Sequence, residues 1–346
     1  MFYSITAAKN FLVYGADVSN AFAEAPPPKQ GFYIYPDRAF HKWWEGHLLR
    51  PPLSPGEVIL VLSAMQGHLE SPRLWEKHAD LILRDIGLAP TIHEPCLYSG
   101  VINGNRVLLK QQVDDFAIAA PDNHTVNILL DLIDDELSIS MKRQGYLDMY
   151  NGIPVLQTRD YIKISTSTFI KKILEKYLST WMNNFTTTTD RPSPLPSDPN
   201  WTKKFSSAIG NLDSAAQKQL ATSMQLSYQC GVGELIWAMT TTRPDLAYMA
   251  VKLSQANCCP HEHHYHGLKH ALNYLYATRD DGIYFWRMAP HMELNKGQLP
   301  PINSNKQDLL LDHFQPKHDA NIVHAYANSD WATCVKTRRS FGSAMI

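Results

Sequence analysis

Three observations predict that this chain has an α+β fold. Short runs of apolar, strand-forming residues occupy positions 11–18 (FLVYGADV), 107–113 and 116–120, as in buried strands. Helical periodicity begins at Ser71 and returns over residues 126–137, where apolar side chains recur three or four positions apart. Because strands and helices alternate irregularly, without the regular order of a parallel sheet, an α+β arrangement is favoured.

Composition restricts the class of protein. With 346 residues and 44% hydrophobic content, the chain can bury one large core or two or three smaller ones. Its 32 basic residues nearly balance 33 acidic ones, so any nucleic-acid site must be local. Five cysteines, an odd number without the spacing of a disulfide framework, indicate a reducing compartment or no disulfide role at all. No apolar run approaches the roughly 20 residues of a membrane helix, and the first residues do not read as a secretory leader, so no membrane partner is expected.

The first half contains the clearest single elements. The strand at 11–18 places Asp17 at or near its end, before the turn-rich EAPPPKQG. The segment SPRLWEKHADLILRDIG then predicts a helix with Ser71 as cap, Pro72 in the first helical position and Gly87 as the stop. Its apolar face is predicted from the spacing of four side chains: Leu74, Trp75, Leu81 and Ile82.

The second half is predicted to be mostly helical. Residues 169–178 show one amphipathic pattern, and further patterns cover about 224–240, 246–256 and 264–277. Between them, residues 186–199 (TTTTDRPSPLPSDP) sustain neither helix nor central strand and predict a linker or long loop.

One pair of adjacent carboxylates differs in context from the others. Asp114 and Asp115 lie at the junction of two predicted strands, whereas the remaining pairs fall on a helix face (Asp134, Asp135) and in a turn (Asp280, Asp281). A tight turn between strands lets both carboxylates lie near one rim. The alternative is a solvated acidic pair without a bound ion.

A divalent cation would neutralise such crowding. Oxygen ligands suit Mg²⁺, which keeps waters and substrate phosphates in its other positions. A third carboxylate, such as Asp17, would allow two ions about 3.5 to 4 Å apart to promote a phosphoryl displacement. Periodicity alone does not bring Asp17 and Asp114 together.

Five sequence blocks resemble one known family in the same order. DVSNAF, MQGHLESPRLW, QVDDFAIA, QGYLDMYNGIPV and TTRPDLAY resemble the reverse transcriptase of Ty1/copia-type LTR retrotransposons, over about residues 16–286. The resemblance implies a right-hand polymerase: partial fingers and a palm with an antiparallel sheet in 1–160, and a helical thumb or connection in 161–290 with the linker near 186–199. Residues 291–346 would form a linker and an incomplete ribonuclease H-like start.

The resemblance also assigns the metal-binding carboxylates. It carries Asp17, Asp114 and Asp115 over as catalytic residues and as ligands of two Mg²⁺ (or Mn²⁺) ions. The implied activity is that of an RNA-directed DNA polymerase. The implied partners are an RNA template, a DNA primer/template duplex, dNTPs and other segments of a Pol polyprotein. The element's replication cycle implies a cytoplasmic location, in a virus-like particle, or a nuclear one.

Three further residues match nucleotide-binding positions of the family. Phe22 matches an aromatic under the sugar that excludes a ribose 2′-hydroxyl, although a plain core Phe is the alternative. Gln66 and Gly67 match a segment over nucleotide and template, although a simple loop before a helix also fits. Downstream basic residues are expected to contact phosphates, although a solvated helix face explains some of them equally well: Lys142, Arg143, Arg159, Lys163, Lys171, Lys172 and Lys176.

The sequence departs from the family pattern at several places. Gln112 replaces an aromatic, and the family's upstream finger strands have no counterpart before Asp17. In YANSDWATC, Asn328 stands where the ribonuclease H pattern has its first Asp, while Asp330 matches the second. An amide is a poor Mg²⁺ ligand, so no ribonuclease H activity is predicted. These departures leave open a catalytically dead retroelement remnant with at most weak nucleic-acid binding.

The cluster CCPHEHHYH at 258–266 allows two interpretations. Cysteine and histidine suit Zn²⁺, which would make a zinc-stabilised interaction module. However, no second paired motif exists, and side chains so close in sequence rarely surround one ion. The start of the helix carrying Leu268, Leu272 and Leu275 is favoured.

Overall fold

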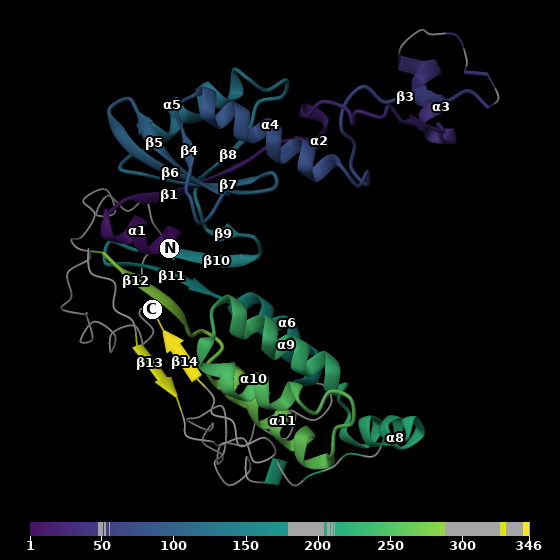
Figure 1. Ribbon diagram of the computed structural model, residues 1–346, viewed down its shortest axis with the longest axis vertical. Coiled ribbons are helices and arrows are strands. Elements are labelled where there is room, and N and C mark those ends of the chain that lie inside the picture. Colours follow the sequence, from purple (N-terminus) through teal and green to yellow (C-terminus); the bar gives the residue numbers. More distant parts are fainter. Residues whose placement is uncertain are drawn as a thin grey trace. The chain divides into compact units, whose positions relative to one another are not determined.

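The computed structural model describes residues 1–47, 51, 53–54, 56–178, 204–205, 208, 210, 212–287, 326–329 and 342–345 (Figure 1). The chain divides into two compact units, Met1–Asn151 and Gly152–Ile346. The predicted linker at 186–199 lies outside the described residues, as does Asp330. Helices combined with antiparallel sheets confirm the predicted α+β class.

A six-stranded antiparallel sheet organises the first unit. In order across the sheet, its strands are β4 (Ala89–Pro90), β5 (Leu97–Ile102), β6 (Asn105–Gln112), β7 (Asp115–Ala120), β1 (Leu12–Asp17) and β8 (Lys142–Tyr146). The first strand of the chain therefore lies between β7 and β8. Residues 12–16 are all buried, which shows that β1 is covered on both faces.

Helices pack on this sheet and extend the unit. α1 (Phe2–Ala8) packs on β1, α4 (Ser71–Asp85) on β4, and α5 (Asn123–Asp134) on β5 and β7 (Figure 1). The short α2 (Ala21–Glu24) packs against α4. The unit also contains β2 (Tyr33–Ile34), paired with β3 (Ile59–Leu60), and α3 (Arg38–His47) and β9 (Met149–Tyr150).

Two predictions about α4 are wrong in detail. Ser71 is the first helical residue and Glu70 is the N-cap, because the Ser71 hydroxyl bonds to Met65 in the preceding loop and does not cap the helix. Leu81 is 59% exposed. The buried face follows the spacing i, i+4, i+8 and comprises Ser71, Trp75, Ala79, Ile82 and Leu83. The predicted stop at Gly87, with φ of 91°, is confirmed.

The second unit contains a helical core and a small sheet. Its helices are α6 (Ser167–Leu178), α8 (Ser214–Met224), α9 (Tyr228–Thr241), the short 3₁₀ helix η2 (Pro244–Leu246), α10 (Ala247–Ser254) and α11 (Glu262–Ala277). Its strands β10 (Ile153–Gln157), β11 (Tyr161–Ser165) and β12 (Gly282–Trp286) are antiparallel. β13 (Tyr326–Ser329) pairs with β14 (Gly342–Met345), and Asn328 is in register with Ser343.

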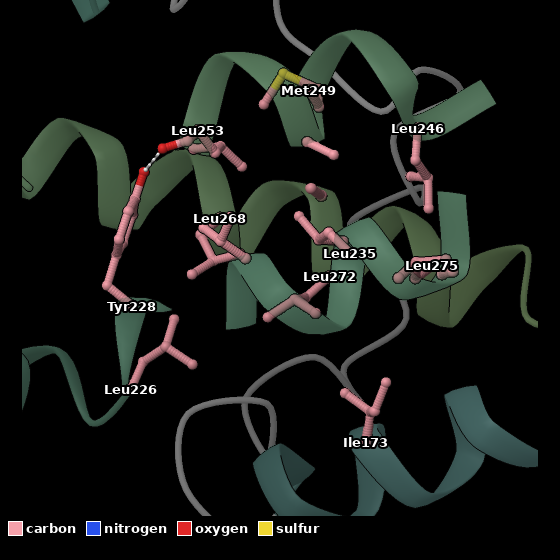
Figure 2. Close-up of a cluster of buried hydrophobic side chains, with 14 of the residues drawn as sticks. Ile173, Leu226, Tyr228, Leu235, Leu246, Met249, Leu253, Leu268, Leu272 and Leu275 are labelled. Carbon is pink, nitrogen blue, oxygen red and sulfur yellow. Dashed lines mark hydrogen bonds between the residues drawn. The ribbon is translucent and has the colours of Figure 1, made fainter. Parts of the chain in front are cut away.

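Leucines from α9, η2, α10 and α11 converge in this core (Figure 2). Leu235, Leu246, Leu253 and Leu268 are all fully buried. The Tyr228 hydroxyl donates to the carbonyl of Leu253 at 2.8 Å (Figure 2), so the one polar atom of that ring is satisfied inside the cluster.

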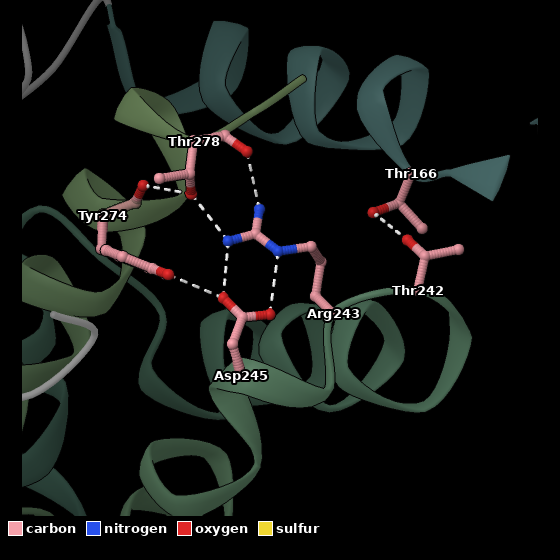
Figure 3. A network of polar contacts seen from close by, with 6 residues as sticks. All are labelled: Thr166, Thr242, Arg243, Asp245, Tyr274 and Thr278. Carbon is pink, nitrogen blue, oxygen red and sulfur yellow. Dashed lines mark hydrogen bonds and ion pairs between the residues drawn. The ribbon is translucent and has the colours of Figure 1, made fainter. Parts of the chain in front are cut away.

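The Arg243-Pro244-Asp245 block forms a buried polar network (Figure 3). Arg243, 2% exposed, donates to both carboxylate oxygens of Asp245, at 3.0 and 2.7 Å, and to the carbonyl and hydroxyl of Thr278, at 2.8 and 2.7 Å. The Tyr274 hydroxyl donates to Asp245 at 2.8 Å. Although burial alone opposes it, the hydrogen bond from Arg243 holds the pKa of Asp245 below its ordinary value. The block therefore ties the start of η2 to the end of α11.

Histidines of the 258–266 cluster begin α11. His261 is the N-cap, and its ring accepts from the backbone N–H of His263. The backbone N–H of His261 donates to Nδ1 of His264 at 2.8 Å. Burial, with a further contribution from His261, lowers the pKa of His264 to about 4. Among the described residues no group of three or more His, Cys, Asp or Glu is arranged to hold a metal ion. The interpretation as a helix start is confirmed.

Within the described part of the chain, no helix is both long and apolar enough to cross a bilayer.

Arg243→Met should lower the free energy of unfolding by about 3 kcal/mol, because the carboxylate of Asp245 and the carbonyl of Thr278 lose their buried partner. Urea unfolding of the full chain, followed by circular dichroism, measures this loss. Arg279→Met removes an exposed arginine and should change the value by less than about 0.5 kcal/mol. Equal effects of the two substitutions would contradict the role given to the network.

His264→Gln should flatten the dependence of stability on pH. In the wild type the folded-state pKa is about 4 against 6.5 for the free side chain, so the unfolded chain binds the proton first. Stability then falls as the pH is lowered, by up to about 2 kcal/mol between pH 7 and pH 5. Gln keeps a hydrogen-bond acceptor at this position but does not bind a proton in this pH range. The control His266→Gln, at an exposed position, should keep the wild-type dependence of stability on pH, measured by urea titration at each pH.

Candidate active site

Strand register brings Asp17 and Asp115 together where β1 ends and β7 begins, beside the turn that carries Asp114. Asp17 is the cross-strand partner of Asp115 in the pairing of β1 with β7. The next residue, Val18, donates its N–H to the carbonyl of Asp114 at 2.9 Å. Asp17 and Asp115 therefore form a non-hydrogen-bonded pair, the type in which side chains lie closest, with Cα atoms about 4.5 Å apart.

The charges of these residues interact. Burial, followed by the charges of Asp114 and Asp17, raises the pKa of Asp115. On its other side, Asp17 is in register with Lys142 of β8. Cross-strand partners share a face, so a row of two carboxylates and one ammonium crosses three strands.

The turn that carries Asp114 has an unusual backbone. Val113 has φ of 55°, and this left-handed conformation is strained for a β-branched residue. Its carbonyl accepts two hydrogen bonds, from the indole N–H of Trp75 at 2.6 Å and from the amide of Gln111 at 3.2 Å. Two side chains therefore hold the peptide that precedes Asp114.

Phe22 lies on α2, the element that follows Asp17. Its side chain is half-buried, which fits both the nucleotide-binding role and the alternative of a core Phe. The carboxylate of Glu24 accepts from the backbone N–H groups of Ser138 and Ile139 at 2.8 and 3.2 Å. This contact ties α2 to the loop after α5.

Gln66 and Gly67 are exposed in the loop before α4. Gly67 has φ of 94°, and no atom lies within 4 Å of where its Cβ would be. Glycine is therefore required here by the turn and not by a close neighbour in the protein. The Ser71 hydroxyl donates to the carbonyl of Met65 at 2.6 Å and accepts from its N–H at 3.1 Å, which fixes the start of the loop.

The donor set fits a hard divalent ion, although no three-ligand cage exists among the described residues. The three side chains supply only carboxylate oxygens, the atoms that Mg²⁺ prefers, and Mg²⁺ is commonly held by one or two carboxylates plus waters and phosphates. Burial is the largest cause of the raised pKa of Asp115, and a cation here would relieve the smaller part that comes from the charges of Asp114 and Asp17.

The predicted basic cluster is partly used in ion pairs. Arg143 bonds to Asp131 and Asp134 of α5 at 2.6 and 2.9 Å, and Lys176 lies 3.2 Å from Glu234. Such pairing makes these two side chains less available to phosphates than expected. Lys142 remains exposed beside the carboxylates.

Comparison with known families decides the ancestry of this chain. The model of the reverse transcriptase (RNA-dependent DNA polymerase) family matches residues 1–191, more than half of the sequence. The chain belongs to the reverse transcriptase family. The match includes Asp17, Asp114 and Asp115 within its bounds.

Three relatives of this reverse transcriptase domain are named as transposon proteins. It is 23% identical to the retrovirus-related Pol polyprotein from transposon TNT 1-94 of Nicotiana tabacum, over 82% of this chain and 20% of that protein. It is 27% identical to the putative transposon Ty5-1 protein YCL074W of Saccharomyces cerevisiae, over 65% of this chain and 67% of that protein. It is 24% identical to the retrovirus-related Pol polyprotein from transposon RE2 of Arabidopsis thaliana, over 80% of this chain and 16% of that protein.

The resemblance to retrotransposons of the Ty1/copia type is thereby confirmed. The chain spans about a fifth of the tobacco Pol polyprotein and about two thirds of the yeast protein.

Asp115→Asn should raise the free energy of unfolding by about 0.5 kcal/mol at neutral pH in the absence of divalent ions, and with it the melting temperature. The raised folded-state pKa of Asp115 means that its ionised form destabilises the fold. The loss of stability caused by ionised Asp115 is fully present above its folded-state pKa and disappears below the ordinary value of 3.8. Calorimetry at pH 7 and pH 3 tests this, with the exposed Asp148→Asn as control. A lower melting temperature at pH 7 would contradict repulsion among the three carboxylates.

Proposed function

We propose that this domain is an RNA-directed DNA polymerase that extends a DNA primer by nucleotidyl transfer. The observation that carries the proposal is the in-register pairing of Asp17 with Asp115, next to the turn that presents Asp114. Membership of the reverse transcriptase family supports the same activity.

Asp17 and Asp114 would bind both of two Mg²⁺ (or Mn²⁺) ions, with Asp115 as a supporting ligand. When bound, such a pair supplies electrostatic stabilisation of the attacking and leaving oxygens of an in-line displacement. The sheet contributes rigidity, since the two carboxylates project from backbones that are hydrogen-bonded to each other.

Phe22, Gln66 and Gly67 would bind the incoming nucleotide. Phe22 is half-buried on a helix that Glu24 anchors, so its ring can present one fixed face to a deoxyribose. The exposed Gln66 and the open backbone at Gly67 leave room for a nucleotide and its template base. An RNA template, a DNA primer/template duplex and dNTPs are the proposed ligands.

Residues 1–160 would serve as partial fingers and palm and residues 161–290 as thumb or connection, with ribonuclease H-like sequence after them. Other segments of a Pol polyprotein are proposed partners, because the chain matches only about a fifth of the tobacco relative. A location in a cytoplasmic virus-like particle or in the nucleus is proposed only from the replication cycle that the resemblance to LTR retrotransposons implies.

Magnesium-dependent extension of a DNA primer on an RNA template tests the function. The wild type and Asp148→Asn, an exposed residue of the same unit, should extend the primer. Asp114→Asn should lose at least about 100-fold in rate, because an amide is a poor ligand for the ions that promote transfer. Absence of extension by folded wild-type protein would refute the proposal and leave the remnant interpretation.

A further inference from the structure

Helix α4 contacts two candidate functional loops through one face. Ser71 and Trp75 are four residues apart, so they lie one above the other on the buried face. Ser71 bonds to both backbone polar groups of Met65, next to Gln66 and Gly67. Trp75 bonds to the carbonyl of Val113, next to Asp114. Neighbouring side chains of one helix therefore hold two segments. One is the loop that carries Gln66 and Gly67, here called the nucleotide loop, and the other is the turn at Val113 and Asp114, here called the carboxylate turn.

The contact from Trp75 is a specific hydrogen bond within a packed environment. Its side chain is 2% exposed, and its indole nitrogen lies 2.6 Å from the Val113 oxygen. Indole N–H is a donor only, and the bond joins residues 38 positions apart. A phenylalanine ring would fill most of the same space without donating.

The carbonyl that Trp75 holds belongs to the peptide unit that precedes Asp114. That unit is planar, so fixing its oxygen fixes the orientation in which the chain enters Asp114. Val113 occupies a strained left-handed conformation, which persists only where the surroundings determine it. Trp75 and Gln111 supply that determination.

We propose that Trp75 is a positioning residue for the reaction, holding the Val113–Asp114 peptide so that the carboxylate of Asp114 stays aligned with that of Asp17. Together with Ser71 it makes α4 a rigid link between the nucleotide loop and the carboxylate turn. The inference rests on the proposed function for its catalytic consequence, while the structural part stands independently.

Trp75→Phe tests the inference, with Trp237→Phe in α9 of the second unit as the matched control. Two quantities are measured on the full chain: kcat and KM for single-nucleotide incorporation, and hydrogen exchange at the Val18 amide, which bonds to the Asp114 carbonyl. Trp75→Phe should lower kcat about tenfold with KM for dNTP unchanged, because a small misplacement of a reacting group lowers the rate. Exchange at Val18 should rise about tenfold. Trp237→Phe should leave both at wild-type values.

The link through Ser71 predicts the opposite division of effects. Ser71→Ala frees the backbone of Met65 and should raise KM for dNTP about tenfold, with a smaller change in kcat. Gln111→Met removes the second side-chain donor to the Val113 carbonyl. Combined with Trp75→Phe, it should lower kcat by more than the product of the two single-variant factors. That excess is expected because only the double variant leaves the carbonyl without a donor side chain.

Each outcome separates the inference from the proposed function. Unchanged exchange at Val18 in Trp75→Phe overturns the inference whether or not the protein polymerises. Faster exchange with unchanged kcat, in an active enzyme, overturns the positioning role. If the wild type incorporates no nucleotide, the proposed function fails, and the exchange data alone decide whether Trp75 holds the turn.

Discussion

The register of β1 against β7 is the constraint on which the rest of the first unit depends. From Leu12 opposite Ala120 to Asp17 opposite Asp115, the two strands pair without a break. Both are buried along most of their length, so the register is fixed by hydrophobic packing and not by the acidic residues themselves. The carboxylates meet because the apolar residues behind them have one acceptable arrangement. The candidate site is thus a consequence of the core.

Buried polar contacts give two of the family-like blocks a structural role. Trp75 of the SPRLW segment holds the turn at Val113, and Arg243 of the TTRPDLAY segment ties η2 to Thr278 at the end of α11. Each contact joins segments far apart in sequence through a side-chain donor to a backbone carbonyl, and Val113 accepts a second such bond from Gln111. Conformational precision in both units therefore depends on a few polar bonds added to a large apolar interior.

Sequence patterns predicted the strands around the three aspartates because strand signals are local, whereas the role of Asp17, Asp114 and Asp115 as metal ligands stays a prediction. The apolar runs around Asp17 and the Asp pair fall within β1, β6 and β7, and family resemblance supplied the link between them. The phase of α4 was misjudged at Leu81, since consecutive apolar residues do not show which one faces the sheet. Nothing in the sequence revealed that Trp75 bonds to Val113, because the two residues are 38 positions apart and only the folded chain brings them together.

The interior position of β1 in the sheet also determines which mutations of a gene for this domain would disrupt the candidate site. β1 is held between β7 and β8, and side chains alternate between faces with a period of two. An in-frame deletion of one codon within residues 12–16 would rotate Asp17 away from Asp115, or force buried apolar groups toward water. Every acidic codon would survive such an event. Integrity of a copy is therefore measured by the spacing of its apolar residues as much as by the presence of its aspartates.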